Sequence, residues 1–389
     1  MSRKPSIAIV HEWLASYAGS ERVVEQMLQV FPQADLFALV DFLPERDRGM
    51  LGDRAVRTSF IQRLPFARRY FRAYLPLMPL AVEQWDFSSY DIVLSSSHAV
   101  AKGVLTRADQ LHISYIHTPI RYAWDLQHEY LRQAGLTRGL KSLLVRPILH
   151  YLRLWDRAAA DRVDVMIANS RYVARRIQKT YRRQAEVIYP PVDTDRFLPV
   201  HPKEDYYVAA SRMVPYKRMD LIVNAFREMP GRQLVVIGDG PDFKKVSKLA
   251  TPNIKIVGYQ EGPSLRGYLQ RAKALVFAAD EDFGILPVEA QACGTPVIAL
   301  GRGGALETIV DGETGILFAD QSVEAILAAV ERFESRPLAL DANGIRERAL
   351  RFSAGRFRRE LDDFVHREWD CFQSERNVEC EASIGGRSD

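Results

Sequence analysis

The chain has 389 residues, which is long enough for two domains that each bury a core of their own. Its composition, with 47% hydrophobic and 26% charged residues, is that of a globular protein and excludes a disordered or fibrous chain. The net charge of +4 is too small to indicate nucleic acid as a partner, although basic residues gather at 63–72 and 171–183.

The cysteines and the apolar runs indicate the compartment. Cys293, Cys371 and Cys380 have no paired metal-ligand spacing, which favours a reducing compartment. The first residues contain only about four apolar ones in a row, too few for a signal peptide, and no later run approaches the roughly 20 that span a bilayer. We therefore expect a cytosolic protein with at most peripheral membrane attachment.

Short apolar runs predict strands in two series along the chain. The first half is the less regular one, with strands expected at 6–10, 35–39, 91–94, 112–116, 163–168 and 186–189. In the second half, strands at 206–210, 233–237, 253–257, 274–278, 296–300 and 315–318 alternate with helix-length segments. This alternation predicts α/β domains with parallel sheets covered on both faces.

Pro190 and Pro191 stop helix and strand alike, so the linker is expected there. The predicted domains are 1–190 and 191–352, both Rossmann-like. Because open α/β sheets bind ligands at the carboxyl ends of their strands, we expect the two domains to share a cleft. The candidate residues that follow predicted strands are Gly19, His98, His117, Arg212, Lys217, Gly238 and Glu281.

Two cations lie close together in "SRMVPYKRMD". Arg212 and Lys217 follow a strand and lead into a helix, which suits a diphosphate that gains charge as it leaves. At an effective dielectric constant of about 20, one pair of unit charges at about 4 Å is worth roughly 4 kcal/mol, enough to replace a metal ion. Taken alone, the two residues favour a surface salt bridge or solvated charges, and only together with the carboxylates described next do they favour a diphosphate site.

The stretch "EDFGILPVEA" adds two carboxylates, Glu281 on a loop and Glu289 in the expected first turn of a helix. Pro287 suits the first helical position and Gly294 the residue just past the helix end. The backbone N–H groups of 283–286 (Phe283, Gly284, Ile285 and Leu286) could then bind ligand oxygens. Helix capping by acidic residues is the alternative.

Weaker signals surround these two. Gly238-Asp239-Gly240 is part of a dinucleotide fingerprint without its third glycine, and we interpret it as a tight turn that approaches the ligand closely. Gly303-Gly304 is either a plain turn or part of the site. Asp193-Thr194-Asp195 has the form of a metal-binding Asp-x-Asp but follows the linker, so turn and cap roles are predicted and no metal site.

Two histidines follow predicted strands of the first half. His117, in "YIHTPIRYAWD", comes at a strand end and could donate to a sugar hydroxyl or a phosphate. His98, in "SSSHAVAKG", is a weaker candidate for such a role.

We call the stretch from Glu281 to Glu289 the acid loop. Together the acid loop, the Arg212/Lys217 pair, "VIGDGP", "VIYPPVDTDRF" and "GRGGALETIVDGETGILF" resemble the retaining family 4 glycosyltransferases of GT-B architecture, over nearly the whole chain. "HEWL", "SSSHAVAKG", "HTPIRYAWDLQHEYL" and "YLRLWDRAAADRVD" resemble the bacterial O-antigen and exopolysaccharide mannosyltransferases. That narrower resemblance implies GDP-mannose as the donor and a lipid-linked saccharide as the acceptor, with no further cofactor.

The resemblance also implies roles for single residues. Arg212 and Lys217 would hold the diphosphate, Glu289 the ribose, Glu281 the donor sugar, and the N–H groups of 283–286 its oxygens. His117 would meet the sugar from the other domain, and Gly19 belongs to the first loop, where the family's Gly-Gly is Ala18-Gly19. A last helix at 353–373 is expected to return to the N-terminal domain, followed by a polar tail at 374–389.

No side chain is marked as a nucleophile, so front-side attack, in which the leaving phosphate takes the acceptor's proton, is favoured over double displacement. A UDP-sugar transferase, a nucleotide-sugar 2-epimerase and a catalytically inactive subunit remain as alternatives.

The segment 64–80, "LPFARRYFRAYLPLMPL", predicts an amphipathic helix. Phe66, Tyr70 and Tyr74 would lie on one face, with Arg68 and Arg72 on the other side. Such a helix suits the interface of an anionic membrane, or else packs its aromatic face into the domain.

Overall fold

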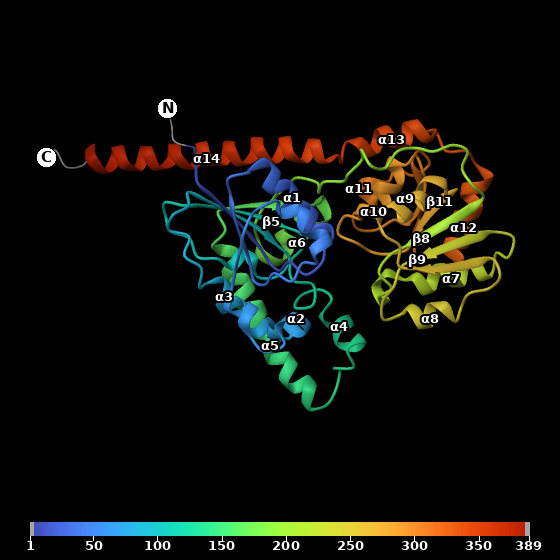
Figure 1. Ribbon diagram of the computed structural model, residues 1–389, viewed down its shortest axis with the longest axis horizontal. Helices are drawn as coiled ribbons and strands as arrows, with labels where there is room; N and C mark the ends of the chain where they lie inside the picture. Colours follow the sequence, from blue (N-terminus) through green and yellow to red (C-terminus); the bar gives the residue numbers. More distant parts are fainter. Residues whose placement is uncertain (1–3, 386–389) are drawn as a thin grey trace. The chain divides into compact units, whose positions relative to one another are not determined.

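The computed structural model describes the backbone of residues 4–385 and their side chains except Gln133 and 377–385. It divides into two compact units (Figure 1). Unit 1 contains the residues up to Tyr189 together with those from Phe357 onward, and unit 2 is Pro190–Arg356. Each unit is built on one parallel sheet, which confirms the predicted α/β class with two Rossmann-like domains.

The sheet of unit 1 has seven strands in the order β3-β2-β1-β4-β5-β6-β7, all paired in parallel. They are β1 (Ile7–His11), β2 (Asp35–Ala38), β3 (Val56–Thr58), β4 (Ile92–Ser97), β5 (Leu111–Ile116), β6 (Val165–Ala168) and β7 (Glu186–Val187). All six predicted strands are confirmed with small shifts at their ends. β3 was not predicted, because three residues are too few to show a period.

Helices cover both faces of this sheet. They are α1 (Gly19–Val30), α2 (Ala67–Tyr70), α3 (Met78–Val82), α4 (Gln127–Gln133), α5 (Leu140–Asp161), α6 (Arg171–Tyr181) and α14 (Ala354–Gly385). Short 3-10 turns lie at Glu45–Leu51, Phe60–Arg63, Phe71–Leu77 and Ala101–Gly103.

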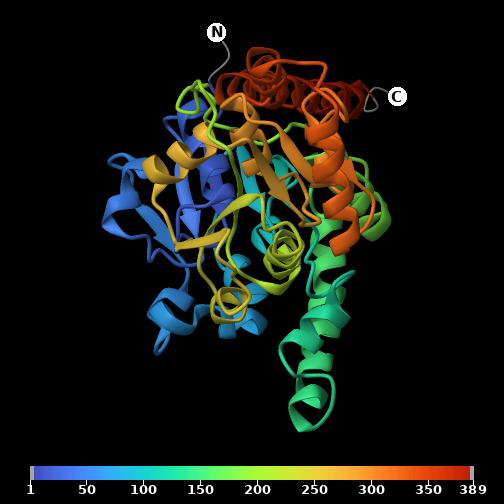
Figure 2. The ribbon, with the colours of Figure 1, turned by 90° about the vertical axis from the view of Figure 1, so that its right-hand side faces the viewer.

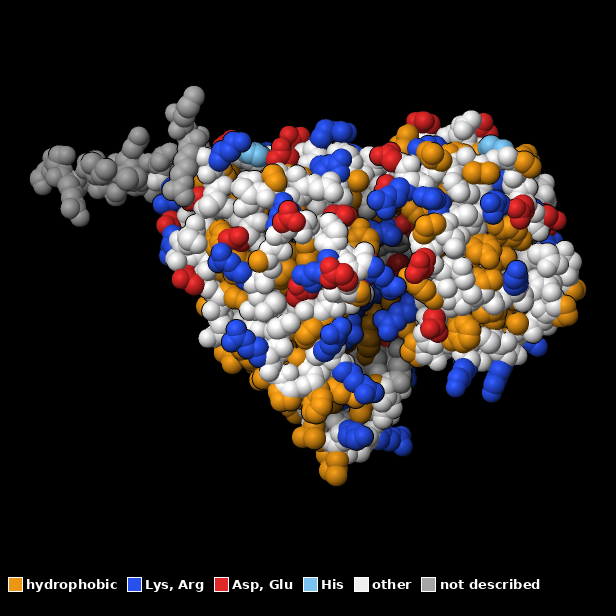
Figure 3. Space-filling view, viewed as in Figure 1, with side chains coloured by type: hydrophobic (Ala, Val, Ile, Leu, Met, Phe, Trp, Pro, Cys, Tyr) orange, Lys and Arg blue, Asp and Glu red, His pale blue; other side chains and the backbone are white. Residues whose placement is uncertain are grey.

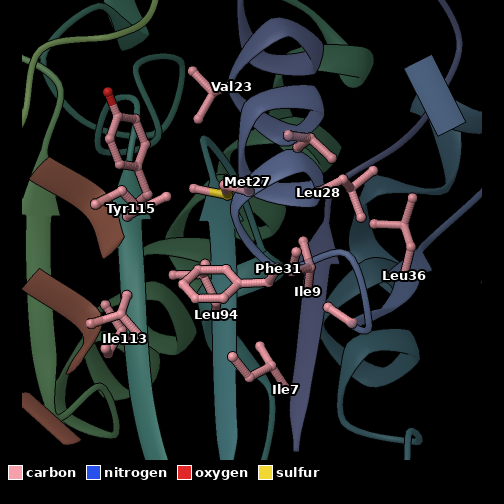
Figure 4. Packing of buried hydrophobic residues seen from close by; sticks show 14 of the residues in the cluster. Ile7, Ile9, Val23, Met27, Leu28, Phe31, Leu36, Leu94, Ile113 and Tyr115 are labelled. Atoms are coloured by element: carbon pink, nitrogen blue, oxygen red, sulfur yellow. The ribbon is translucent and has the colours of Figure 1, made fainter. Parts of the chain in front are cut away.

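The side chains of β1 show how the core is divided between the two faces. Ile7 and Ile9 pack with α1 and α14 on one face, whereas Ala8 and Val10 pack among aromatic rings on the other. Figure 4 shows Ile7 and Ile9 beside Phe31 and Leu94 in the first of these clusters. Because alternate residues point to opposite faces and both faces are covered, the strand is apolar throughout.

The last helix returns to unit 1, as predicted. Phe357, Leu361, Phe364 and Val365 of α14 are buried in the cluster that contains Ile7 and Ile9. The helix is longer than the predicted range 353–373, since it runs to Gly385. Most of the segment predicted as a polar tail is therefore helical, and residues 386–389 lie outside the described part of the chain.

Unit 2 repeats the plan with six parallel strands in the order β10-β9-β8-β11-β12-β13. They are β8 (Tyr206–Ala210), β9 (Gln233–Ile237), β10 (Ile254–Gly258), β11 (Ala274–Phe277), β12 (Val297–Leu300) and β13 (Gly315–Phe318). The helices are α7 (Met219–Arg227), α8 (Phe243–Ser247), α9 (Gly262–Arg271), α10 (Ile285–Ala292), α11 (Ala305–Thr308), α12 (Val323–Ser335) and α13 (Ala342–Leu350), with a 3-10 turn at Pro215–Lys217.

Both sheets reverse their strand order at one place. In unit 1 the first strand, β1, lies between β2 and β4, and in unit 2 the first strand, β8, lies between β9 and β11. The connections on the two sides of such a point run in opposite directions, which leaves a crevice outside the strand ends where open α/β sheets bind ligands. The loops after β1, β4, β8 and β11 are therefore the places to look for function.

The predicted single helix at 64–80 is wrong. The segment forms α2, a 3-10 turn at Phe71–Leu77 and the start of α3, with Phe66 in the left-handed region at φ 54°. Phe71 is buried, and the Tyr74 hydroxyl donates to the Pro65 carbonyl at 2.6 Å. Only part of the aromatic face thus reaches the surface, because Pro76 and the left-handed turn break the helical period. Within the described residues, no helix is long and apolar enough to cross a bilayer.

Candidate functional site

Lys217 and Glu281 form an ion pair in unit 2. Lys217 ends the 3-10 turn that follows β8, and Glu281 lies on the loop that follows β11, so the pair lies at the strand reversal of this sheet. Both side chains are mostly shielded, with 17% and 20% of their surface exposed. A partly shielded pair is screened less by salt than a surface pair, so each charge holds the other in place.

The helix after Glu281 begins earlier than the sequence predicts. α10 starts at Ile285, so Pro287 is its third residue and not its first. Glu289 is consequently the fifth residue, in the second turn, and it is buried. Gly294, at φ 64°, follows the helix end as predicted.

The start of α10 offers backbone donors. Gly284 precedes the helix at φ 85°, a left-handed conformation that glycine adopts without strain. The first N–H groups of a helix have no acceptor within it, so those of Ile285 and Leu286 are available to ligand oxygens. Phe283 is buried and packs edge-on against Phe352 at 5.3 Å, which anchors the loop before the helix.

Gly303 and Gly304 pack closely against the backbone of the acid loop. A Cβ on Gly303 would lie 2.2 Å from the Glu281 carbonyl oxygen, and one on Gly304 would lie 2.3 Å from the Phe283 Cα. The Gly304 N–H donates to that same Glu281 carbonyl at 2.8 Å. This resolves the open question about these glycines: they permit the backbone contact that positions Glu281.

Gly238 has a similar role beside Lys217. A Cβ on Gly238 would lie 1.8 Å from the Ser211 carbonyl oxygen, and Gly238 has φ 136°. The Met213 N–H donates to the Asp239 carbonyl at 2.8 Å. The close approach predicted for this turn is therefore made to protein backbone, namely the segment that leads from β8 to Lys217.

Two further predicted features lie near the surface of unit 2. Arg212 is exposed on the loop after β8, five residues before Lys217. Asp193 forms an ion pair with Arg196 at 2.9 Å within one turn, as a surface turn residue does, while Thr194 between the two aspartates is buried.

In unit 1, His117 follows β5 and joins a chain of polar contacts. Its Nε2 lies 2.8 Å from the Ser96 Oγ, which lies 3.2 Å from His11 Nδ1. His11 Nε2 in turn lies 3.7 Å from a carboxylate oxygen of Glu21. The chain connects the ends of β5, β4 and β1 to the first turn of α1.

Gly19 is the first residue of α1 and lies at the end of this chain, since the Ala18 N–H donates to Glu21 Oε2 at 3.1 Å. Ala18 has φ −134° and ψ −159°, extended backbone that any residue adopts. The absence of the family's first glycine therefore puts no strain on this loop. The network of His117 thus ends at Glu21 and Ala18, and Gly19 is the next residue in the sequence.

Sequence reasoning missed Glu12. Its buried carboxylate accepts hydrogen bonds from the Ser97 hydroxyl and from the backbone N–H groups of residues 98–101, at 2.7–3.1 Å. These bonds hold the loop after β4, including His98, against the end of β1. A charged residue directly after a buried strand, as in "VHEW", was the available signal.

His98 and His117 are held neutral by their surroundings. Burial lowers the pKa of His117 well below its ordinary value, and the neighbouring His98 and His11 lower it further. Burial also lowers the pKa of His98, although Glu12 opposes this. Burial opposes the charged form of Glu12 too, but His98 and the backbone N–H groups outweigh it, so the pKa of that carboxyl is lowered. His98 and His117 can thus act as hydrogen-bonding groups more readily than as cations.

We predict that the free energy of unfolding falls as the pH is lowered from about 7 to about 5. Burial lowers the pKa of His112 in β5 to about 3, whereas an unfolded histidine titrates near pH ~6.5. Below that pH the unfolded chain takes up a proton on His112 that the folded chain does not, which removes up to about 1.4 kcal/mol per pH unit. Urea unfolding at a series of pH values measures the slope. His112→Gln should reduce the slope of unfolding free energy against pH by about this amount. An unchanged slope would contradict the assignment of this pH dependence to His112.

Two family models match adjoining parts of the chain. The family described as "Glycosyltransferase Family 4" matches residues 17–196, and "Glycosyl transferases group 1" matches residues 193–351.

Named relatives cover about half of the chain. A GDP-mannose-dependent alpha-(1-6)-phosphatidylinositol monomannoside mannosyltransferase of Mycolicibacterium smegmatis is 32% identical over 49% of this chain and 58% of the relative. The enzyme of that name from Mycobacterium tuberculosis is 31% identical over 55% of this chain and 65% of the relative. A D-inositol 3-phosphate glycosyltransferase of Mycobacterium avium is 29% identical over 43% of this chain and 46% of the relative. The match therefore spans between about half and two thirds of these relatives.

Solved structures share the fold over nearly the whole chain. Sucrose-phosphate synthase of Thermosynechococcus elongatus has a TM-score of 0.72 at 17% identity. The match covers 94% of this chain and 100% of the synthase chain. HepE of Anabaena, solved with UDP and glucose, has a TM-score of 0.68 at 17% identity, with coverage of 93% and 99%. At such identities the likeness shows the fold alone. The two family matches together reach from residue 17 to residue 351, so most of the chain is similar to the glycosyltransferases of these two families.

Proposed function

We propose that the chain is a retaining glycosyltransferase that moves mannose from GDP-mannose to a lipid-linked saccharide in the synthesis of a surface polysaccharide. The observation that carries this proposal is the Lys217–Glu281 ion pair at the strand reversal of unit 2. A cation that can meet a diphosphate and a carboxylate that can meet sugar hydroxyls lie side by side there, beside the N–H groups at the start of α10.

The pair has two states in this proposal. Without donor, each side chain neutralises the other. When the donor binds, Lys217 and Arg212 take the diphosphate, and Glu281 turns to sugar hydroxyls. The N–H groups of 283–286 bind oxygens of the same ligand, and Glu289 binds the ribose. The last two assignments, together with the roles of Gly19 and His117 toward the donor, rest on the family resemblance.

The proposed reaction is a front-side displacement. The acceptor oxygen forms its bond to the anomeric carbon on the face from which the phosphate oxygen leaves. The leaving phosphate takes the acceptor's proton, so that the products are the glycosylated acceptor and GDP. Lys217 and Arg212 stabilise the charge that develops on the diphosphate, which is the role a metal ion has in other enzymes.

The names of the relatives support the donor and the class of acceptor. Two of them are named as GDP-mannose-dependent and as acting on a phosphatidylinositol mannoside, which is a lipid-linked saccharide. We therefore also propose peripheral contact with the inner face of the cytoplasmic membrane, through the exposed part of 64–80. Phe66 and Tyr70 are 80% and 51% exposed there.

Lys217→Ala is expected to lower turnover by about 10²- to 10³-fold, because one donor to the leaving group is lost. Glu281→Ala should act on the same scale, whereas Glu289→Ala should weaken nucleotide affinity. Lys245→Ala is the matched control, since Lys245 also pairs with a carboxylate of unit 2, that of Asp220 at 2.9 Å. Initial rates of sugar transfer measure the effect. Near-normal turnover of folded Lys217→Ala would refute the role of Lys217.

Transfer is expected to survive a chelator. Cationic side chains have the role of the metal in this proposal, and Asp193 is engaged with Arg196. Rates with and without EDTA test this. Loss of activity with EDTA, restored by Mg²⁺ or Mn²⁺, would show that Asp193-Thr194-Asp195 or another site binds a metal.

GDP is expected to bind more tightly than UDP. The reason is the resemblance to mannosyltransferases, since no residue of the chain is assigned to the guanine. Calorimetric titration of the protein with each nucleotide measures the order. The reverse order would indicate a UDP-sugar donor on the same fold.

A further inference from the structure

Helix α5 carries an apolar stripe that the fold does not use. Four of its members are 45–81% exposed, and Pro147 is exposed as well. The stripe consists of Leu140, Leu144, Pro147, Tyr151 and Leu154. Intervals of four and three residues place them on one face of the helix over more than three turns.

The opposite face of α5 already holds the helix to unit 1. Leu149 and Leu152 are buried in a cluster with Ile120, Ala123 and Leu131. On the same helix, Trp155 Nε1 donates to Glu83 Oε1 at 2.9 Å. The stripe is therefore not needed to seat α5, and contiguous exposed apolar surface of this kind marks an interaction site.

The segment 64–80 lies next to α5 and adds further exposed apolar side chains. Leu75 of that segment packs against the cluster that contains Leu149 and Leu152, so the two segments are neighbours. Among the described residues, ten of the seventeen large hydrophobic side chains that are exposed lie within 66–80 or 130–154. Figure 2 shows α5 extending away from the sheet of its own unit, and Figure 3 shows hydrophobic and basic side chains gathered at that end. We call this combined area the docking surface.

The docking surface is positively charged, which favours a negatively charged partner. Residues 54–82 contain six arginines and no Asp or Glu, and residues 130–155 contain four arginines, one lysine and again no Asp or Glu. Two copies of the chain meeting through this surface would bring like charges together, which is unfavourable. An anionic lipid bilayer offers the opposite charge around an apolar interior.

We propose that the docking surface binds the interface of an anionic bilayer, with the α5 stripe as its main apolar contact. The leucines enter the boundary between headgroups and acyl chains, while Lys141 and Arg146 beside them meet lipid phosphates. This deepens the proposed membrane contact through 64–80 and assigns most of the apolar burial to α5. It rests on the proposed function only for its purpose, since the surface itself can be tested without donor or acceptor.

The test is flotation of the full chain with vesicles, in the absence of nucleotide sugar. Wild-type protein should float with vesicles of phosphatidylcholine and phosphatidylglycerol, less so at high salt, and not with phosphatidylcholine alone. Leu140→Glu with Leu144→Glu should reduce bound protein by about tenfold or more, since apolar area is lost and the added charge is repelled. These side chains are 81% and 69% exposed, so the fold should tolerate the change, which circular dichroism checks.

Leu198→Glu with Leu306→Glu is the matched control. These leucines of unit 2 are 49% and 55% exposed and lie outside the docking surface, so this variant should float as the wild type does. Equal loss in both variants would mean that net charge alone decides binding and would overturn the role of the stripe. Arg68→Glu with Arg72→Glu should also release the protein, which tests the basic part of the surface.

Light scattering separates the remaining outcomes. A wild-type dimer that Leu140→Glu with Leu144→Glu converts to a monomer, with no flotation of the wild type, would make the stripe an interface between copies and overturn the proposal. A wild-type protein that is a monomer in solution and does not float with the vesicles would also overturn the proposal. Calorimetric binding of GDP to both leucine variants should equal that of the wild type, so a failure of the proposed transferase activity would be seen separately from a failure of docking.

Discussion

A parallel sheet delivers the loop after every strand to the same edge, and the rest of this structure depends on that constraint. Both units reverse their strand order beside their first strand, so the loops after β1 and β4, and after β8 and β11, lie next to each other. Lys217 and Glu281 are far apart in sequence and meet because their strands are neighbours. Glu12 and the loop that it holds meet in unit 1 for the same reason.

Close backbone contacts hold the loops of unit 2. Gly238 lets its turn lie against the carbonyl of Ser211, and Gly304 lets the acid loop lie against the next connection. A side chain at either position would push these loops apart. The backbone positions of Lys217 and Glu281 are therefore set by the protein before any ligand arrives. Such preorganisation is what the proposed front-side displacement requires, because its catalysis would rest on position and on stabilised charge.

In unit 1, buried polar groups hold the loops after the strands in place. Glu12 exchanges water for four backbone N–H groups and a hydroxyl, so its charge is stable in the interior. His117, Ser96 and His11 form a chain in which burial keeps His117 neutral. A neutral imidazole can donate to or accept from a sugar hydroxyl without adding charge to the site. The two units thus offer different chemistry: cation and carboxylate in one, neutral polar groups in the other.

The sequence by itself determined the strands and the returning helix, because apolar period and helix length are local properties. The linker at Pro190-Pro191 stays a prediction. It also marked Lys217, Glu281 and His117, which directly follow such strands. Only the tertiary structure decided that Lys217 pairs with Glu281, that Gly304 supports the acid loop and that Glu12 organises the loop of His98, since these contacts join segments distant in the chain. It likewise broke the predicted helix at 64–80 and left one face of α5 bare, because packing against neighbours, and not the helical period, decides which side of a segment is buried.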